Sequence, residues 1–97
     1  MVHNVFFWLK ADADSAKFEA GAKSLLGIDV VESGTIRKSA ATPERPVTDK
    51  SFSYHLSLTF ASIDDHNTYQ DHPQHHEFVE NCLDLWERVV VYDSEAI

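Results

Sequence analysis

Polar and apolar side chains alternate most regularly between residues 51 and 61. Five apolar side chains occupy every second position and four polar ones lie between them: Phe52, Tyr54, Leu56, Leu58 and Phe60 alternate with Ser53, His55, Ser57 and Thr59. Because successive side chains of a strand point to opposite faces, this period predicts a strand with one apolar face. The following Ser62-Ile63-Asp64-Asp65 resembles a capping box and predicts a short helix with Ile63, His66 and Tyr69 on one side.

Three further segments have the pattern of strands. Residues 3–9 are apolar on both faces, with His3, Val5, Phe7 and Leu9 pointing one way and Asn4, Phe6 and Trp8 pointing the other. A strand of this kind needs a cover on each side. Residues 28–38 predict a second strand, in which we expect Gly34 to mark a bulge or bend. Residues 88–93 predict the last strand.

Two longer helices follow from apolar positions at helical spacing. The first has helix-start side chains at Asp12, Asp14 and Ser15, then an apolar face of Phe18, Ala22, Leu25 and Leu26. We expect Gly27 to end it. The second should begin at Pro73, because proline fits the first helical turn. Its apolar stripe contains His75, Phe78, Val79, Cys82, Leu85 and Trp86.

The predicted order of elements is β-α-β-β-α-β, in one domain that covers residues 1–97. Its usual arrangement is an α+β fold, a four-stranded antiparallel sheet with both helices on one face. The open face would carry valines of the last strand together with Phe6, Trp8, His55, Ser57 and Thr59. Because a monomer rarely exposes such an apolar patch, we predict a homodimer that joins two sheets through this face.

The composition narrows the classes of partner. A formal net charge of −8 and a pI near 5.0 leave no basic stripe for a nucleic acid or an anionic membrane surface. No apolar run approaches the roughly 20 residues that span a bilayer. Cys82 is the single cysteine, so no disulfide forms within the chain. We recognise no signal-peptide pattern and expect a cytoplasmic protein.

The segment from Tyr69 to Phe78 places a phenol and three imidazoles around a proline. A neutral His75 has a pKa range that suits a general base, and the Tyr69 hydroxyl can stabilise charge that develops on an enolate oxygen. Two other interpretations stay open. One is a ligand-binding pocket without turnover. The other is a structural hydrogen bond that fixes the start of the helix, because a buried hydroxyl and a buried imidazole both need partners.

The remaining histidines have less specific interpretations. His3 lies on the helix-facing side of its strand and can enter the same pocket, but its place near the terminus also fits a frayed side chain. His72 precedes Pro73, where capping or packing explains it. A zinc site needs three or four converging ligands. His72 and His76 are four residues apart, with His75 and His66 close by. However, His75 and His76 point about 100° apart on a helix and no HExxH motif is present, so we expect no metal and no cofactor.

Motifs of one known family are spread along nearly the whole chain. They are His3-Asn-Val-Phe6, the spacing Phe18…Leu25…Ile28, Gly34, the run Phe52–Phe60, Tyr69-Gln-Asp-His-Pro-Gln-His75 with Phe78, and the closing Val91-Tyr-Asp93. They resemble the stress-responsive A/B barrel (Dabb) family, and Tyr-x-x-His-Pro-x-His is the most specific of them. The resemblance implies a ferredoxin-like protomer and a tight homodimer, the dimeric α+β barrel.

The family includes plant stress-induced proteins, bacterial members without assigned activity, and the plant polyketide cyclase olivetolic acid cyclase. In that cyclase a tyrosine and a histidine of the same element carry an aldol reaction, and they fall on Tyr69 and His75. Its early pocket histidine falls on His3, whereas its third-strand pocket histidine falls on Tyr54, where this chain departs from the pattern. A shared fold does not by itself transfer a reaction.

These observations predict a stress-response-type protein with a pocket for a small apolar or aromatic molecule. Tyr69 and His75 are the candidate catalytic residues for proton transfer or a cyclase-like lyase reaction without a cofactor. The candidate ligand-binding residues are His3, Val5, Phe7, Tyr54 and His72. The alternative is a non-catalytic stress-response protein that acts through stable homo-oligomeric assembly.

Overall fold

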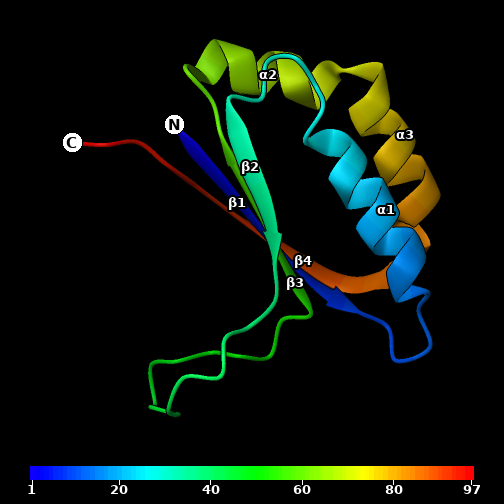
Figure 1. Cartoon of the computed structure of the whole chain (residues 1–97), viewed down its shortest axis with the longest axis vertical. Coiled ribbons are helices and arrows are strands. Elements are labelled where there is room, and N and C mark those ends of the chain that lie inside the picture. The colour runs from blue at the N-terminus through cyan, green and yellow to red at the C-terminus, as the bar shows by residue number, and fades with distance from the viewer.

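The computed structural model describes all of residues 1–97 (Figure 1). Its elements are β1 Val2–Leu9, α1 Ser15–Leu25, β2 Ser33–Arg37, β3 Tyr54–Thr59, α2 Ile63–Asp71, α3 Pro73–Cys82, the 3₁₀ turn η1 Leu83–Leu85, and β4 Trp86–Ser94. A long loop, which contains Pro43 and Pro46, joins β2 to β3. None of the helices has the length and apolar character needed to cross a lipid bilayer.

The four strands form one sheet in the order β2-β3-β1-β4, and every neighbouring pair is antiparallel. The helices all lie on one side of this sheet, as Figure 1 shows. The arrangement is a ferredoxin-like α+β fold, which confirms the predicted fold class. The first and last strands are neighbours in the sheet, so that residues from both ends of the chain lie side by side.

Side-chain caps set the boundaries of α2 and α3. Ser62 Oγ accepts a hydrogen bond from the Asp65 N–H at 3.1 Å, as the capping-box pattern predicts. His72 has an extended backbone that ends α2, and its Nδ1 accepts a hydrogen bond from the Gln74 N–H at 3.0 Å. Pro73 therefore occupies the first turn of α3, where its missing N–H costs no hydrogen bond.

β2 begins at Ser33, later than the strand predicted over residues 28–38. The residues before it form turns. The Ile28 N–H donates to the Leu25 carbonyl at 3.2 Å, and the Val31 N–H donates to the Ile28 carbonyl at 2.9 Å. These turns place the Ile28 side chain in the core. The prediction was wrong here because a buried turn carries the same apolar residues as a buried strand.

Gly34 does not mark the predicted bulge. It pairs with Leu58 in the regular register of β2 and β3. A Cβ atom at this position would lie 2.5 Å from Leu58 Cδ2 and 2.7 Å from Leu26 Cδ2. Lack of space beside the core, rather than backbone conformation, therefore explains the glycine.

The apolar stripe predicted for the second long helix is divided among three elements. α3 ends at Cys82, a 3₁₀ turn follows, and Trp86 opens β4 opposite Leu9. The Lys10 N–H donates to the Leu85 carbonyl at 2.9 Å, which ties the turn to the end of β1. The helical part of the stripe is therefore shorter than predicted.

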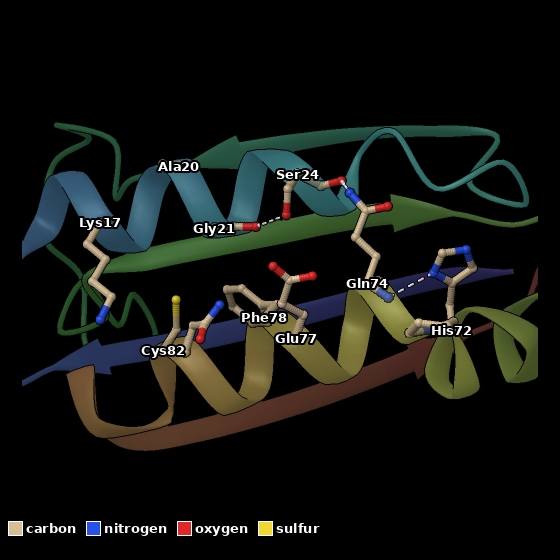
Figure 2. A pocket seen from close by; sticks show the side chains of 11 residues that line it. Lys17, Ala20, Gly21, Ser24, His72, Gln74, Glu77, Phe78 and Cys82 are labelled. Carbon is tan, nitrogen blue, oxygen red and sulfur yellow. Dashed lines mark hydrogen bonds between the residues drawn. The ribbon is translucent and has the colours of Figure 1, made fainter.

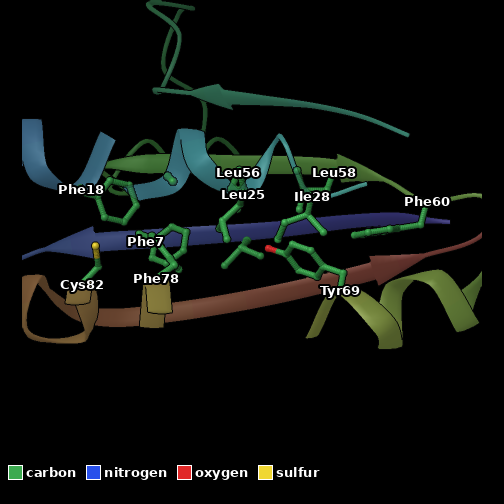
Figure 3. Packing of buried hydrophobic residues seen from close by; sticks show 12 residues of the cluster. Phe7, Phe18, Leu25, Ile28, Leu56, Leu58, Phe60, Tyr69, Phe78 and Cys82 are labelled. Carbon is green, nitrogen blue, oxygen red and sulfur yellow. The ribbon is translucent and has the colours of Figure 1, made fainter. Parts of the chain in front are cut away.

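The hydrophobic core lies between the helices and the sheet (Figure 3). Its buried members are Val5, Phe7, Phe18, Ala22, Leu25, Ile28, Leu56, Leu58, Phe60, Tyr69, Phe78 and Cys82. α1 and α3 approach each other closely at Gly21, where a Cβ atom would lie 2.9 Å from Cys82 Sγ. The Cys82 thiol is thus buried between two helices, and burial raises its pKa.

The uncovered face of the sheet carries an aromatic cluster. Phe6 stacks on His55 with ring centroids 4.2 Å apart and an interplanar angle of 7°. The edges of Phe52 and Tyr92 also meet the Phe6 ring. Val90 lies opposite Phe6 in the register and therefore shares this face.

Candidate functional site

A cavity of about 140 Å³ lies between the helices and the sheet. Its hydrophobic lining comes from Val5, Phe7, Leu25, Leu56, Tyr69, Phe78, Val79, Trp86, Val89 and Val91, and its other lining residues are His3, Gln70 and His75. Five of the predicted site residues, His3, Val5, Phe7, Tyr69 and His75, therefore line one cavity. An apolar lining with a few convergent polar groups is typical of a small-molecule site.

Tyr69 brings a hydroxyl group into this apolar environment. Its side chain extends from α2, is only 1 % exposed, and directs its oxygen toward the centre of the core (Figure 3). Burial raises the pKa of Tyr69 far above its usual value, and no hydrogen bond opposes the shift. The hydroxyl is therefore protonated at neutral pH and available as a donor to a ligand oxygen.

His75 lies in the first turn of α3, with its ring beside Tyr69. The two ring centroids are 4.8 Å apart and the planes meet at 67°. His75 Nδ1 is buried and has no hydrogen-bond partner within the chain. Burial lowers the pKa of His75, and the nearby imidazoles of His76, His3 and His66 lower it further. The ring is therefore neutral at pH 7 and retains the lone pair that a base needs.

His3 links the cavity to the outer edge of the sheet. Its side chain is buried rather than frayed, and its Nδ1 lies 2.5 Å from Oδ1 of Asp93 in β4. Burial lowers the pKa of His3, and the Asp93 carboxylate opposes that shift. His3 Nε2 lies 3.4 Å from the side-chain amide nitrogen of Gln70 on α2.

The family model of the stress-responsive A/B barrel domain matches residues 1–96. The chain belongs to the Dabb family. The match includes all the strands and helices that line the cavity. It confirms the family resemblance, of which the Tyr69–His75 element is the most specific part. No curated protein matches the chain in sequence.

Solved structures of similar shape support this assignment. A Dabb family protein from Mesorhizobium loti is 26% identical, with a TM-score of 0.80 over 99% of this chain and 95% of that one. A hydroxynitrile lyase from Passiflora edulis is 19% identical, with a TM-score of 0.78 over 99% and 94%. A dimeric protein of unknown function from Bacteroides fragilis is 19% identical, with a TM-score of 0.69 over 98% and 94%. The last two likenesses show the fold alone.

Two predicted ligand-binding residues of this Dabb protein lie outside the cavity. The Tyr54 hydroxyl donates to Glu19 Oε2 at 2.6 Å and faces a separate cleft beside α1. Burial and the Glu19 carboxylate raise the pKa of Tyr54. His72 caps α3 and lines a groove of about 610 Å³ between α1 and α3 (Figure 2). Its ring nitrogen is already used by the Gln74 N–H, so the cap holds the ring away from the cavity.

Sequence reasoning missed Gln70 and Asp93. Gln70 follows His66 by four residues on α2, a spacing that places both on one side of the helix and was the available signal. Asp93 meets His3 only because β1 and β4 pair in a register that puts these two residues opposite each other. No local spacing indicates such a contact.

Proposed function

We propose that this Dabb protein binds a small apolar or aromatic molecule in the cavity and transfers a proton with His75 and Tyr69. The observation that carries the proposal is a buried polar atom without a hydrogen-bond partner, His75 Nδ1, which lies beside the desolvated Tyr69 side chain in one apolar cavity. Buried polar groups are nearly always hydrogen-bonded in folded proteins. A bound ligand would supply the missing partner.

The volume of the cavity limits the ligand. An apolar cavity of roughly 150 Å³ accepts benzene, and the present one measures about 140 Å³. The favoured ligand is therefore a single ring or a chain of similar size that carries one carbonyl or hydroxyl group. A long polyketide chain would need the cavity to open further.

In the proposed step, His75 removes a proton from the carbon next to a ligand carbonyl. The imidazole becomes imidazolium, and the electron pair of the C–H bond moves onto the carbonyl oxygen as an enolate. The Tyr69 O–H donates a hydrogen bond to that oxygen. General-base catalysis and oxyanion stabilisation each contribute a factor of roughly 10² or more in rate. The hydroxynitrile lyase among the structural relatives supports a lyase-type reaction only through its fold.

We further propose that two copies pair through the uncovered face of the sheet. The protomer is a thin slab with extents of 36 × 35 × 17 Å, and the Phe6 cluster lies on its uncovered face. Trp8 lies on the same face, under the guanidinium of Arg88 at 4.2 Å. Polar His55 and Ser57 would line the interior between the two sheets. The dimeric relative from Bacteroides fragilis supports this assembly.

This aromatic face also favours the second candidate function, a non-catalytic protein that acts through its homo-oligomeric assembly. An exposed apolar patch of this kind is typical of an interaction surface. Proton transfer requires a ligand in the cavity, whereas the assembly function does not. Assembly alone requires neither the Tyr69 hydroxyl nor the His75 imidazole.

Thermal-shift and NMR titrations with one-ring phenols, aromatic aldehydes and small β-keto compounds test the proposal. A ligand at about 100 times its Kd adds roughly 2.7 kcal/mol to stability, which raises Tm by several degrees in a domain of this size. Binding should weaken in Tyr69→Phe and in His75→Ala. The matched controls, Tyr92→Phe and His76→Ala, remove the same groups from exposed positions and should bind as the wild type does. If no compound of the panel bound, the result would favour the non-catalytic function through homo-oligomeric assembly.

A further inference from the structure

Two imidazole rings from distant parts of the chain meet beside the cavity. His3 on β1 and His66 on α2 have ring centroids 4.7 Å apart. One ligand atom from each of His3, His66 and Asp93 lies within 4.8 Å of the other two. The proposed proton transfer uses neither His66 nor Asp93, so this cluster requires a separate explanation.

Hydrogen bonds determine which ring nitrogens present lone pairs. His3 Nδ1 faces Asp93 Oδ1 at 2.5 Å, and His66 Nδ1 faces the Asn67 Oδ1 at 3.1 Å. Because both oxygens are acceptors, Nδ1 of each neutral ring carries the proton and Nε2 carries the lone pair. Metal-binding histidines are held in the same way, with the second ring nitrogen donating to a carboxylate or carbonyl oxygen.

The two Nε2 atoms converge on the side-chain amide of Gln70. Gln70 Nε2 lies 3.4 Å from His3 Nε2 and 3.5 Å from His66 Nε2. These distances are long for hydrogen bonds. The two distances instead match the spacing of ligand atoms around a tetrahedrally coordinated metal ion. With metal–nitrogen bonds of about 2.0–2.1 Å, neighbouring ligand atoms lie about 3.3–3.4 Å apart. Half a turn of the amide places Oε1 where Nε2 now lies.

We propose that His3 Nε2, His66 Nε2 and Gln70 Oε1 bind one divalent transition-metal ion, while Asp93 orients the His3 ring. Imidazole nitrogens suit zinc and the neighbouring first-row ions. The nearby carboxylate and the formal net charge of −8 favour a cation. Three protein ligands leave one tetrahedral position for water. The prediction of no metal weighed His66 only together with His72, His75 and His76, because β1, α2 and β4 bring the present set together only in the folded chain.

One residue of the cluster is open to solvent. A shallow cleft of about 130 Å³ at the end of β4 is lined by Met1, Ile63, Asp93, Ser94 and Glu95. The Asp93 side chain is 43 % exposed in this cleft. The carboxylate is therefore in contact with solvent, whereas the His3 ring that it orients is buried.

Titration of the full chain with Co²⁺ and then Zn²⁺ tests this inference without any organic ligand, so its outcome is independent of the proposed function. Co²⁺ should bind once per chain with the intense visible absorption of a four-coordinate ion, and Zn²⁺ should displace it. His66→Ala should lower the affinity at least about 10-fold, and Asp93→Asn should lower it roughly 10–100-fold. Gln70→Glu should raise the affinity, because an anionic oxygen replaces a neutral one.

His76→Ala is the matched control, since it removes an exposed histidine of α3 from outside the cluster. It should bind Co²⁺ as the wild type does. His66 is only partly buried on a helix, so its replacement by alanine should leave the fold intact, which circular dichroism verifies. Equal affinity of His66→Ala and the wild type, or a wild-type spectrum of six-coordinate Co²⁺ alone, would overturn the proposal.

Discussion

His3 Nδ1 lies 2.5 Å from Asp93 Oδ1, and this contact joins the two ends of the chain across adjacent strands. The two side chains differ in environment. His3 is 4 % exposed, whereas Asp93 is 43 % exposed. The carboxylate thus supplies an acceptor to a ring nitrogen that water cannot easily reach. The orientation of a cavity-lining ring therefore depends on the last strand.

Asp93→Ala should lower the free energy of unfolding by about 1–3 kcal/mol, because it leaves a buried imidazole N–H without its acceptor. Urea denaturation at pH 7 measures the effect. Glu95→Ala is the control, since it removes an exposed carboxylate from the segment just after β4. If both variants unfolded at the same urea concentration as the wild type, the contact would have no structural role.

Gly34→Ala should destabilise the protein by about 1–3 kcal/mol through overpacking. Its Cβ would lie 2.5 Å from Leu58 Cδ2, and Leu58 is completely buried. Gly27→Ala is the matched control, because its Cβ would meet only the Ser24 carbonyl at 3.7 Å and no glycine has a positive φ. That change should be neutral or stabilise by roughly 0.4–1 kcal/mol. Equal melting temperatures of the two variants would contradict the steric explanation.

The stability of the fold should decrease as the solution is acidified. Burial, and secondarily Arg37, lower the pKa of His55 below its usual 6.5, so the unfolded chain binds more protons than the folded chain below that pH. Neutral His55 therefore makes its full contribution to the free energy of unfolding above about pH 6.5. This contribution is lost as the pH falls through the lowered pKa of the folded state. His55 Nε2 also lies 2.8 Å from Asn4 Oδ1.

Urea denaturation at pH 7.5 and pH 5.5 measures this dependence. His55→Gln should show a smaller loss between the two pH values than the wild type, because it removes one titrating group. The buried His3 and the half-buried His75 also have lowered pKa values, so they should leave a residual pH dependence of the same sign. An unchanged pH dependence in His55→Gln would assign the whole effect to those two residues.

Phe6→Asp should dissociate the proposed dimer. It places a carboxylate at the centre of the aromatic cluster, between His55 and Tyr92, where a second sheet would desolvate it. Light scattering should give a monomer, and circular dichroism should show that the helices persist. Val47→Asp, in the long loop with its side chain 82 % exposed, should leave the assembly unchanged. A Phe6→Asp protein that remained dimeric would place the interface elsewhere.

The elements of the fold could be predicted because their signals are local. Alternation gives β3, the cap at Ser62 starts α2, and Pro73 starts α3, so each pattern lies within the element that it predicts. The start of β2 was missed because the buried turn at Ile28 is as apolar as a strand. The explanation of Gly34 was missed for a related reason, since the crowding comes from Leu26 and Leu58 in other parts of the chain.

In the candidate site, too, local contacts could be predicted and contacts between distant parts of the chain could not. Tyr69 and His75 lie in one short segment around a proline, and their proximity could be predicted. The contacts of His3 with Asp93 and Gln70 depend on strand register and on how α2 packs, which no spacing in the sequence specifies. Tyr54 lines a different cleft because Glu19, on a separate element, accepts its hydrogen bond.

The final prediction compares Tyr69→Phe with Tyr54→Phe, which separates a ligand-directed hydroxyl from a structural one. Burial alone shifts the pKa of Tyr69 and no hydrogen bond contributes, so removal of the hydroxyl should leave the free energy of unfolding unchanged or slightly raised. Tyr54→Phe breaks the hydrogen bond to Glu19 and should cost about 0.5–1.5 kcal/mol.

Ligand binding should show the opposite order, with Tyr69→Phe impaired and Tyr54→Phe unaffected. Paired denaturation and titration of the two variants measure both properties. Protein folds retain a buried hydroxyl without a partner at a cost in desolvation, and a ligand that accepts its hydrogen bond removes that cost. A large loss of stability in Tyr69→Phe would therefore assign the hydroxyl to the fold and remove the main support for the proposed site.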